Sequence, residues 1–140
     1  MYNAVSHLQW LDLQHNYLMT LTEELNKFQN LKSLYLHVNY IADTKEFMKI
    51  STLPQLRALT VHGNPIDKIP NFRLYLISMF PQLKKLDTVL ISKKERDNAS
   101  VMKNQFKLNK LPAYTERDCP VPPEIQSKNP QKDEANNFNL

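Results

Sequence analysis

Aliphatic residues recur along the first half of the chain at fixed intervals. In three segments, apolar side chains occupy the first, fourth, sixth and eleventh positions, and an asparagine occupies the ninth. The segments span residues 8–18, 31–41 and 56–66, so their starts lie 23 and 25 residues apart. Self-similarity with a period of about 20–50 residues is typical of proteins whose repeats stack on one another. Three copies in phase therefore predict a stack of structural repeats.

The spacing within each repeat predicts a short strand followed by a turn. Side chains of a strand alternate between its two faces, so the fourth and sixth positions point into a core and the fifth points outward. We expect strands near residues 10–13, 34–36 and 59–61, stacked in parallel along one concave face. The asparagine is expected to bond backbone groups of its own coil and of the neighbouring coil. A purely helical protein is the alternative, but the spacing fits a strand and turn better than a helix.

The predicted fold is an α/β leucine-rich repeat solenoid that is short and ends in a cap. A fourth copy begins at Leu83 and Leu86, but Ile91 stands where an asparagine is expected. The apolar residues of 72–80 predict a helix over the open end, and residues 92–95 have the Ser-Lys-Lys-Glu pattern of a capping box. Terminal repeats are atypical because they cover the last coil. We expect three parts: repeats and cap in residues 1–91, a basic helix in 92–110 and an extended proline-rich tail in 111–140.

Length and composition favour one small intracellular domain. A chain of 140 residues builds a single core. Residues 1–7 are too few to cover the first coil, so we expect that coil to be open or sealed by another chain. Cys119 is the only cysteine, which excludes an intrachain disulfide and favours a reducing compartment. Since the sequence shows neither a bilayer-spanning apolar run nor a signal peptide, we expect a cytoplasmic protein without a membrane partner.

The predicted helix after the cap is basic. Residues 91–110 contain six basic and two acidic residues, whereas residues 111–140 contain three basic and five acidic residues. A basic helix suits an acidic protein surface, such as that of tubulin, or nucleic acid. Nucleic acid is the less favoured partner, because no aromatic stacking motif alternates with the lysines; an ordinary solvated helix face is the further alternative. The candidate binding residues of the helix are Lys93, Lys94, Arg96, Lys103 and Lys107.

The outward-facing strand positions form the candidate partner-binding surface. They include Trp10 and Tyr35 beside the carboxylate of Asp12, and large aromatic residues anchor many protein interfaces. The alternative is that these aromatic residues pack only against each other. His37 and His62 are predicted on adjacent strands, which lie roughly 4.8 Å apart, but no third ligand aligns with them for a metal ion. The candidate residues of the concave face are Trp10, Asp12, Tyr35, His37, Arg57 and His62.

Sequence motifs of catalysis and of cofactor binding are missing. The only glycine, Gly63, lies in a repeat turn, so the chain has no glycine-rich phosphate loop. It also lacks the Gly-x-Ser-x-Gly, His-Glu-x-x-His and Cys-x-x-Cys patterns. Cys119 stands next to Pro120 in the tail, where little would position it as a nucleophile. We therefore predict a protein that is not an enzyme and needs no cofactor.

The proline-rich segment 111–140 has neither a helical nor a strand period. In isolation such a segment is expected to be extended. A surface that holds it would be either the solenoid itself or, as the favoured alternative, a neighbouring chain in a larger assembly. The apolar candidates for its anchors are Val121, Ile125, Phe138 and Leu140.

The cap region carries a combination of short motifs. Residues 59–66 read LTVHGNPI, residues 80–87 read FPQLKKLD, Phe72 and Arg73 precede Tyr75, and residues 93–96 read KKER. In these features the chain resembles intracellular leucine-rich repeat proteins of the phosphatase-regulator type, which end in a dedicated cap. Members of this group include the axonemal dynein light chain of this fold, a spliceosomal protein and tubulin-folding cofactors. Within the group, the chain is most similar to a short member associated with cilia.

The resemblance implies a structural role. It points to a non-enzymatic scaffold of the ciliary axoneme, part of the cytoskeleton, that binds other axonemal proteins or tubulin. The alternative is a regulatory adaptor that binds a phosphatase or a dynein motor through the same concave face. A subunit of a nuclear ribonucleoprotein is a third possibility, which would require the basic helix to face RNA.

Overall fold

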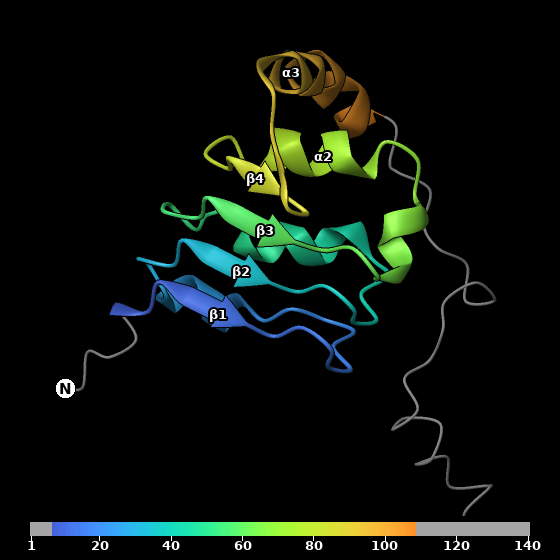
Figure 1. Ribbon diagram of the computed structural model, residues 1–140. Coiled ribbons are helices and arrows are strands. Elements are labelled where there is room, and N and C mark those ends of the chain that lie inside the picture. Colours follow the sequence, from blue (N-terminus) through green and yellow to red (C-terminus); the bar gives the residue numbers. More distant parts are fainter. Residues whose placement is uncertain (1–6, 109–140) are drawn as a thin grey trace, which may run out of the picture.

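Five short strands in residues 7–108, the part of the chain that the structure describes, form one sheet (Figure 1). In this computed structural model the first four strands run parallel, and the fifth runs antiparallel to the fourth. The strands are β1 (Trp10–Asp12), β2 (Ser33–Tyr35), β3 (Ala58–Thr60), β4 (Lys85–Leu86) and β5 (Val89–Leu90). Their order in the sheet follows their order in the chain. The predicted α/β leucine-rich repeat fold is confirmed.

The repeat leucines stack in register across the sheet. Leu11 pairs with Leu34, Leu34 with Leu59, and Leu59 with Leu86. Leu34, Leu59 and Leu86 are at most 1% exposed, whereas Leu11 on β1 is only partly buried. This column of leucines lines the core between the sheet and the segments behind it, and the first described coil is the least buried one.

Two short 3-10 helices lie behind the strands (Figure 1). They are η1 (Glu23–Lys27) and η2 (Thr44–Ile50). Each begins after a residue whose side-chain oxygen accepts from a backbone N–H two residues further on, Thr22 for η1 and Asp43 for η2. Each helix also turns apolar residues toward the core, Leu25 from η1 and the pair Phe47 and Ile50 from η2. A 3-10 helix suits such a short connection because it rises further per residue than an α-helix.

A buried carboxylate joins the backs of the first two coils. Glu46 on η2 is 9% exposed, and its Oε2 atom accepts from the Leu21 N–H at 2.7 Å. The same oxygen lies 2.7 Å from Nζ of Lys49, which also donates to the Leu21 carbonyl. A buried charge requires such partners, so this cluster fixes how one coil stacks on the other.

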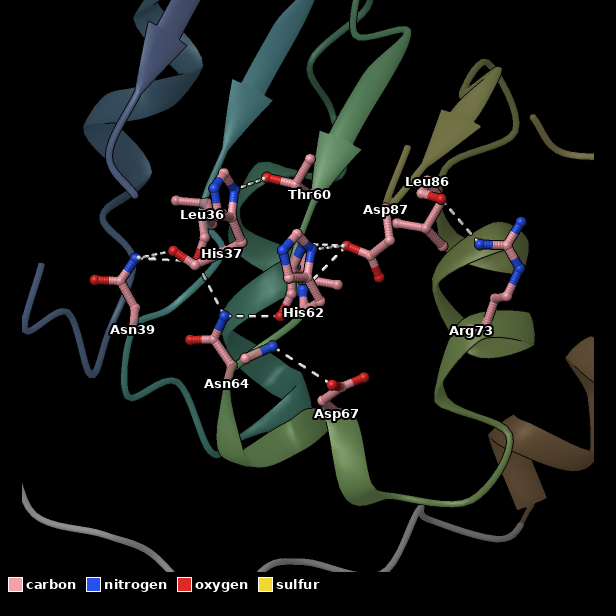
Figure 2. Close-up of polar contacts among 12 residues, drawn as sticks. Leu36, His37, Asn39, Thr60, His62, Asn64, Asp67, Arg73, Leu86 and Asp87 are labelled. Atoms are coloured by element: carbon pink, nitrogen blue, oxygen red, sulfur yellow. Dashed lines mark hydrogen bonds and ion pairs between the residues drawn. The ribbon is translucent and has the colours of Figure 1, made fainter. Parts of the chain in front are cut away.

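The turn asparagines link neighbouring coils on the strand side (Figure 2). Nδ2 of Asn39 donates to the carbonyl of Leu36 in its own coil and to that of Leu13 in the preceding coil. Its Oδ1 atom accepts from the Leu18 N–H of the preceding coil. Asn64 makes the equivalent contacts one coil further on. The predicted role of the asparagines, to satisfy backbone groups of two coils, is confirmed for Asn39 and Asn64, whereas Asn16 donates to the carbonyls of Leu13 and Gln14 in its own coil.

The stack ends in a hairpin and a helix. The short helix η3 (Pro65–Lys68) leads into α2 (Phe72–Met79), which covers the core beyond β3. β4 then ends after two residues, because Asp87 and Thr88 take positive φ values of 50° and 67°. A two-residue turn with positive φ at both positions is favoured in hairpins, and it returns the chain as β5. The fourth coil thus reverses just before Ile91, where the repeat pattern lacks its asparagine, although the sequence analysis did not predict β5.

The basic helix α3 (Lys93–Leu108) packs on α2 at the end of the stack (Figure 1). Its start is the predicted capping box: Ser92 N–H donates to Glu95, and Glu95 N–H donates to Oγ of Ser92. Glu95 also pairs with Arg73 of α2, with Nε and Oε1 2.7 Å apart. Ala99 is buried against the core. The described residues contain no helix with the length and apolar character needed to cross a membrane.

Candidate functional site

The concave face of the sheet exposes a large aromatic side chain, that of Trp10 on β1. This side chain is 55% exposed, and its ring meets that of Tyr35 on β2 edge to face, with centroids 6.0 Å apart. Tyr35 is partly buried because Trp10 lies on one side of it and His37 on the other. The two predicted aromatic residues therefore form one patch, and the indole supplies most of its accessible surface.

The aromatic patch continues into two stacked imidazoles where the strands end (Figure 2). The rings of His37 and His62 are nearly parallel, with centroids 4.6 Å apart, as expected for adjacent strands. Nδ1 of His37 lies 2.7 Å from Oγ1 of Thr60, and Nδ1 of His62 lies 3.2 Å from Oδ1 of Asp87. Burial lowers the pKa of His37 below its usual range, and the neighbouring His62 lowers it further, so the folded structure favours the neutral ring.

Two carboxylates flank these rings along the ends of the strands. Asp12 accepts from the backbone N–H and from Nε2 of Gln14, at 3.0 and 2.7 Å. Oδ1 of Asp87 accepts from the N–H groups of Val61 and His62, at 2.7 and 3.0 Å. Because β4 stops at Leu86, the Asp87 side chain supplies acceptors that a longer strand would have offered to the neighbouring coil. Asp87 therefore completes the backbone pairing between the coils of β3 and β4, as well as facing the site.

Basic residues lie at the opposite ends of the strands. Nη1 of Arg57, just before β3, donates to the carbonyls of Pro54 and Leu56 in its own coil. Lys85 on β4 is exposed and shares a register column with Trp10. The concave face thus has basic residues toward the starts of its strands and carboxylates toward their ends. Arg57 belongs to the rim of the candidate surface.

The candidate residues of the basic helix divide into two groups. Lys93, Lys94 and Lys103 are exposed on α3. Arg96 is partly buried and donates instead to carbonyl oxygens at the end of α2 and beyond, those of Ile77, Phe80 and Leu83. The Lys107 side chain and the tail candidates Val121, Ile125, Phe138 and Leu140 lie outside the described residues.

The geometry of the site suits contact with another protein. Within the part of the chain that the structure describes, no three or more histidine, cysteine and carboxylate side chains are grouped to hold a metal ion. The rings of His37 and His62 stack face to face, and their Nδ1 atoms bond to different partners. Flat ring faces with hydrogen-bonding edges suit contact with another chain.

The structure adds a cavity of about 320 Å³ between the ends of β3 and β4 and the start of α2. Its apolar lining includes Val61, Ile69, Phe72 and Leu86, and its polar lining includes Asp67, Arg73 and Asp87. The sequence analysis did not predict this cavity, because its residues come from two coils and the cap. The local signals in the sequence are a carboxylate directly after β4, Asp87, and one in η3 after β3, Asp67.

Known proteins share the sequence pattern and the fold of this chain. The sequence profile of a leucine-rich repeat family matches residues 2–113. Leucine-rich repeat-containing protein 51 of Rattus norvegicus is 40% identical over 97 residues, which is 69% of this chain and 50% of that protein. Leucine-rich repeat-containing protein 23 of Homo sapiens is 31% identical over 106 residues, 76% of this chain and 31% of that protein. The chain spans about half the length, or less, of these curated relatives.

Solved structures share the same fold. A chain of the Drosophila melanogaster SNF/U2A′ complex superposes with a TM-score of 0.69 at 27% identity, covering 74% of this chain and 64% of that chain. The leucine-rich repeat domain of Mex67 from Chaetomium thermophilum superposes with a TM-score of 0.56 at 24% identity, covering 64% and 63%. The second likeness is one of fold alone.

Proposed function

Because this chain belongs to the leucine-rich repeat family, we propose that it is a non-enzymatic scaffold that binds another protein through the concave face of its sheet. Stacked repeats form an extended surface that is well suited to contacts with a second chain. The relatives that it matches carry the name of the repeat, and the U2A′ structure is that of a complex with SNF. Binding to a protein is therefore the role that both the family and the surface favour.

The observation that carries this proposal is the exposure of Trp10. An indole with 55% of its surface accessible leaves apolar area that a partner can cover, at roughly 25 cal/mol per Å². Tryptophan and tyrosine are also enriched among the residues that dominate binding energy at interfaces. Trp10 already contacts Tyr35 edge to face, so it loses less side-chain entropy on binding than an indole without such a contact.

The cellular setting that we propose is the ciliary axoneme. Its support is the resemblance of the cap to that of the axonemal dynein light chain and of cilia-associated members of the group. The exposed lysines 93, 94 and 103 of α3 suit an acidic surface such as that of tubulin, since opposite charges attract over about 10 Å at moderate salt. Axonemal proteins or tubulin are accordingly the proposed partners.

Two other roles use the same surface. A regulatory adaptor would bind a phosphatase or a dynein motor through the concave face and change its rate. A nuclear ribonucleoprotein subunit is favoured by one observation, the likeness to a chain of the SNF/U2A′ complex. Extraction separates the three: a scaffold stays with the axoneme through detergent and leaves at high salt, an adaptor is released by detergent, and a ribonucleoprotein subunit is nuclear and sensitive to RNase.

A pair of substitutions tests the concave face itself. In cells where the tagged chain is chemically cross-linked to its neighbours, Trp10→Ala should reduce the yield of the main cross-linked protein at least about fivefold, as loss of an interface anchor implies. Met48→Ala is the matched control, because Met48 is 59% exposed but lies on η2 behind the sheet. Equal yields from the two variants would move the interface away from the concave face.

A further inference from the structure

We propose that the cavity at the end of the sheet, here termed the cap pocket and lined by Val61, Asp67, Phe72, Arg73 and Asp87 among others, binds one cationic side chain, of arginine or lysine, from the partner on the concave face. This inference rests on the proposed function, since it names the chemistry of that partner at one position. The cap pocket shares Asp87 with the concave face and adds residues of η3 and α2 that lie outside it.

The two carboxylates of the cap pocket converge on one turn (Figure 2). Oδ1 of Asp87 accepts from the His62 N–H at 3.0 Å, and Oδ2 of Asp67 accepts from the Gly63 N–H at 3.4 Å. These two N–H groups belong to consecutive residues, so both carboxylates lie against the same short stretch of backbone. Asp67 comes from η3, and Asp87 comes from the turn after β4. Two carboxylates that border the same pocket favour a cation between them.

The described residues leave this negative charge largely uncompensated. Neither carboxylate forms an ion pair with a lysine or an arginine among them; Asp87 pairs only with the His62 ring. Arg73 also lines the pocket, but its guanidinium is engaged by Glu95 and by the Leu86 carbonyl. That pairing lowers the pKa of Glu95 to about 2, so Glu95 stays ionised and balances Arg73.

The walls of the cap pocket match the rest of an arginine or lysine side chain. Val61, Phe72 and Leu86 are at most 5% exposed and present apolar surface. Long cationic side chains lay their methylene groups along such surface and keep the charged end at a polar edge. A volume of about 320 Å³ is at the lower end of the range for ligand pockets, which fits one side chain better than a larger ligand.

The position of the cap pocket points to a partner protein as the source of this side chain. His62 belongs to the stacked pair on the concave face, and its ring also contacts Asp87 of the pocket. A chain that covers Trp10, Tyr35 and the two imidazoles therefore reaches the pocket at the last coil. Arginine is enriched among the residues that anchor interfaces, and its planar fork is able to meet two carboxylates at once.

Binding of capped amino acids to the whole chain, followed by two-dimensional NMR of its amides, tests the proposal. The probes are the N-acetyl methylamides of arginine and lysine, with that of norleucine as an uncharged control for the lysine stem. We expect saturable shifts at the amides of residues 61–63 and 67, with a dissociation constant of about 1–10 mM. The norleucine probe should bind at least about threefold more weakly, because it lacks the charge.

A charge-neutralising pair of variants completes the test. Asp67→Asn keeps an oxygen that can accept from Gly63, and it should weaken binding of the arginine and lysine probes about threefold or more. Asp97→Asn removes an exposed carboxylate on α3 and should leave the affinity unchanged. Equal affinity of the norleucine and lysine probes, absence of saturable shifts, or full affinity in Asp67→Asn would each overturn the proposal.

The result is independent of the test of the concave face, because the probes involve no partner protein. Probe binding that depends on Asp67 supports the cap pocket even if Trp10→Ala leaves cross-linking unchanged, in which case the proposed concave interface alone fails. Loss of cross-linking in Trp10→Ala without probe binding supports the scaffold and rejects the cationic subsite.

Discussion

The residue before each turn asparagine has a left-handed backbone conformation. His15, Val38 and Gly63 occupy these equivalent positions, with φ values of 52°, 57° and 73°. Glycine adopts such values readily, whereas a β-branched valine is strained there. A Cβ atom on Gly63 would also lie 3.1 Å from Cγ2 of Val38 and 3.2 Å from its nitrogen. The single glycine of the chain therefore stands where the backbone conformation favours it and where a Cβ atom would be crowded.

Relief of the strain at Val38 should stabilise the protein. Asparagine tolerates the left-handed region better than valine does, and Val38 is 38% exposed, so little packing is lost. We expect Val38→Asn to raise the free energy of unfolding by about 0.5–1 kcal/mol. Urea unfolding followed by circular dichroism measures this as a higher midpoint with an unchanged slope.

Val101→Asn is the matched control for this prediction. Val101 is 73% exposed on α3, where valine and asparagine have similar helix propensities. The free energy of unfolding of Val101→Asn should stay within about 0.5 kcal/mol of that of the original chain. A midpoint for Val38→Asn at or below that of the control would show that the left-handed backbone costs nothing at this site.

The lowered pKa of His37 links stability to pH. Burial and, next, the His62 charge hold this pKa below 6.5, although Asp12 and Asp87 oppose the shift and His15 adds to it. The unfolded chain therefore binds a proton at His37 more readily than the folded chain does. This contribution to stability is complete above about pH 6.5 and is lost as the pH falls toward the lower, folded-state pKa.

Replacement of the ring isolates this effect. His37→Gln retains a group able to bond Thr60 but does not titrate, so its urea midpoint should change less between about pH 7.5 and pH 5.5. Imidazole NMR signals of the original chain measure the His37 pKa directly. An identical pH slope in the variant would assign the dependence to other groups.

At the scale of elements, local patterns predicted what depends on local chemistry. The strands, the asparagine turns and the Ser92–Glu95 capping box each follow from residues close together in sequence. The β4–β5 hairpin did not, because Asp87 and Thr88 lack the glycine that usually marks a turn with two positive φ values. The burial of Arg96 also depends on how α3 lies across α2. The sequence pattern therefore placed Arg96 among the solvent-facing lysines of the helix.

Arg96 should matter for stability far more than the lysines beside it. Its guanidinium satisfies carbonyl oxygens of Ile77 and Phe80, at 2.8 and 3.0 Å, which the end of α2 leaves without helical partners. Arg96→Ala removes this partner from the Ile77 carbonyl and leaves the Phe80 carbonyl with its bond from the Leu83 N–H. We expect the substitution to cost about 2–4 kcal/mol. Urea unfolding provides the measurement. Lys94→Ala, an exposed position on the same helix turn, should change stability by less than about 0.5 kcal/mol.

Arg96→Lys separates the effect of the positive charge from that of the planar guanidinium group. Arg96→Lys keeps the positive charge but cannot donate in the same planar fork, so its stability should lie between those of the original chain and Arg96→Ala. Full stability in the alanine variant would mean that water satisfies these carbonyls and that α3 is held by Ala99 and by the Arg73–Glu95 pair.

At the scale of the whole molecule, the candidate surface has two origins. The concave columns follow from the phase of the repeat, so Trp10, Tyr35, His37 and His62 could be placed side by side from sequence alone. The cap pocket depends on the folded positions of η3, α2 and the β4 turn, and no period brings Asp67 and Asp87 together. The regular coils therefore provide the predictable part of the surface, and the cap adds the part that only the fold reveals.

The stacking of coils also predicts how the molecule unfolds. Each coil contacts its immediate neighbours, so its stability depends on them. Leu36 in the middle coil is 0% exposed, and its carbonyl accepts from both Asn39 and Asn64. We expect Leu36→Ala to cost about 2–5 kcal/mol, a large share of the total of about 5–15 kcal/mol that domains have. Hydrogen exchange should therefore accelerate across β1, β2 and β3 together.

Leu11→Ala is the matched change in a terminal coil. Leu11 is partly buried on β1 and has a strand neighbour on one side among the described residues, so its loss should accelerate exchange in the first coil and leave that of β3 nearly unchanged. A smaller free-energy cost than that of Leu36→Ala follows from the smaller buried area. If Leu36→Ala instead accelerated exchange only in its own coil, the coils would be independent, and a partner on Trp10 could not stabilise the cap pocket at the other end of the sheet.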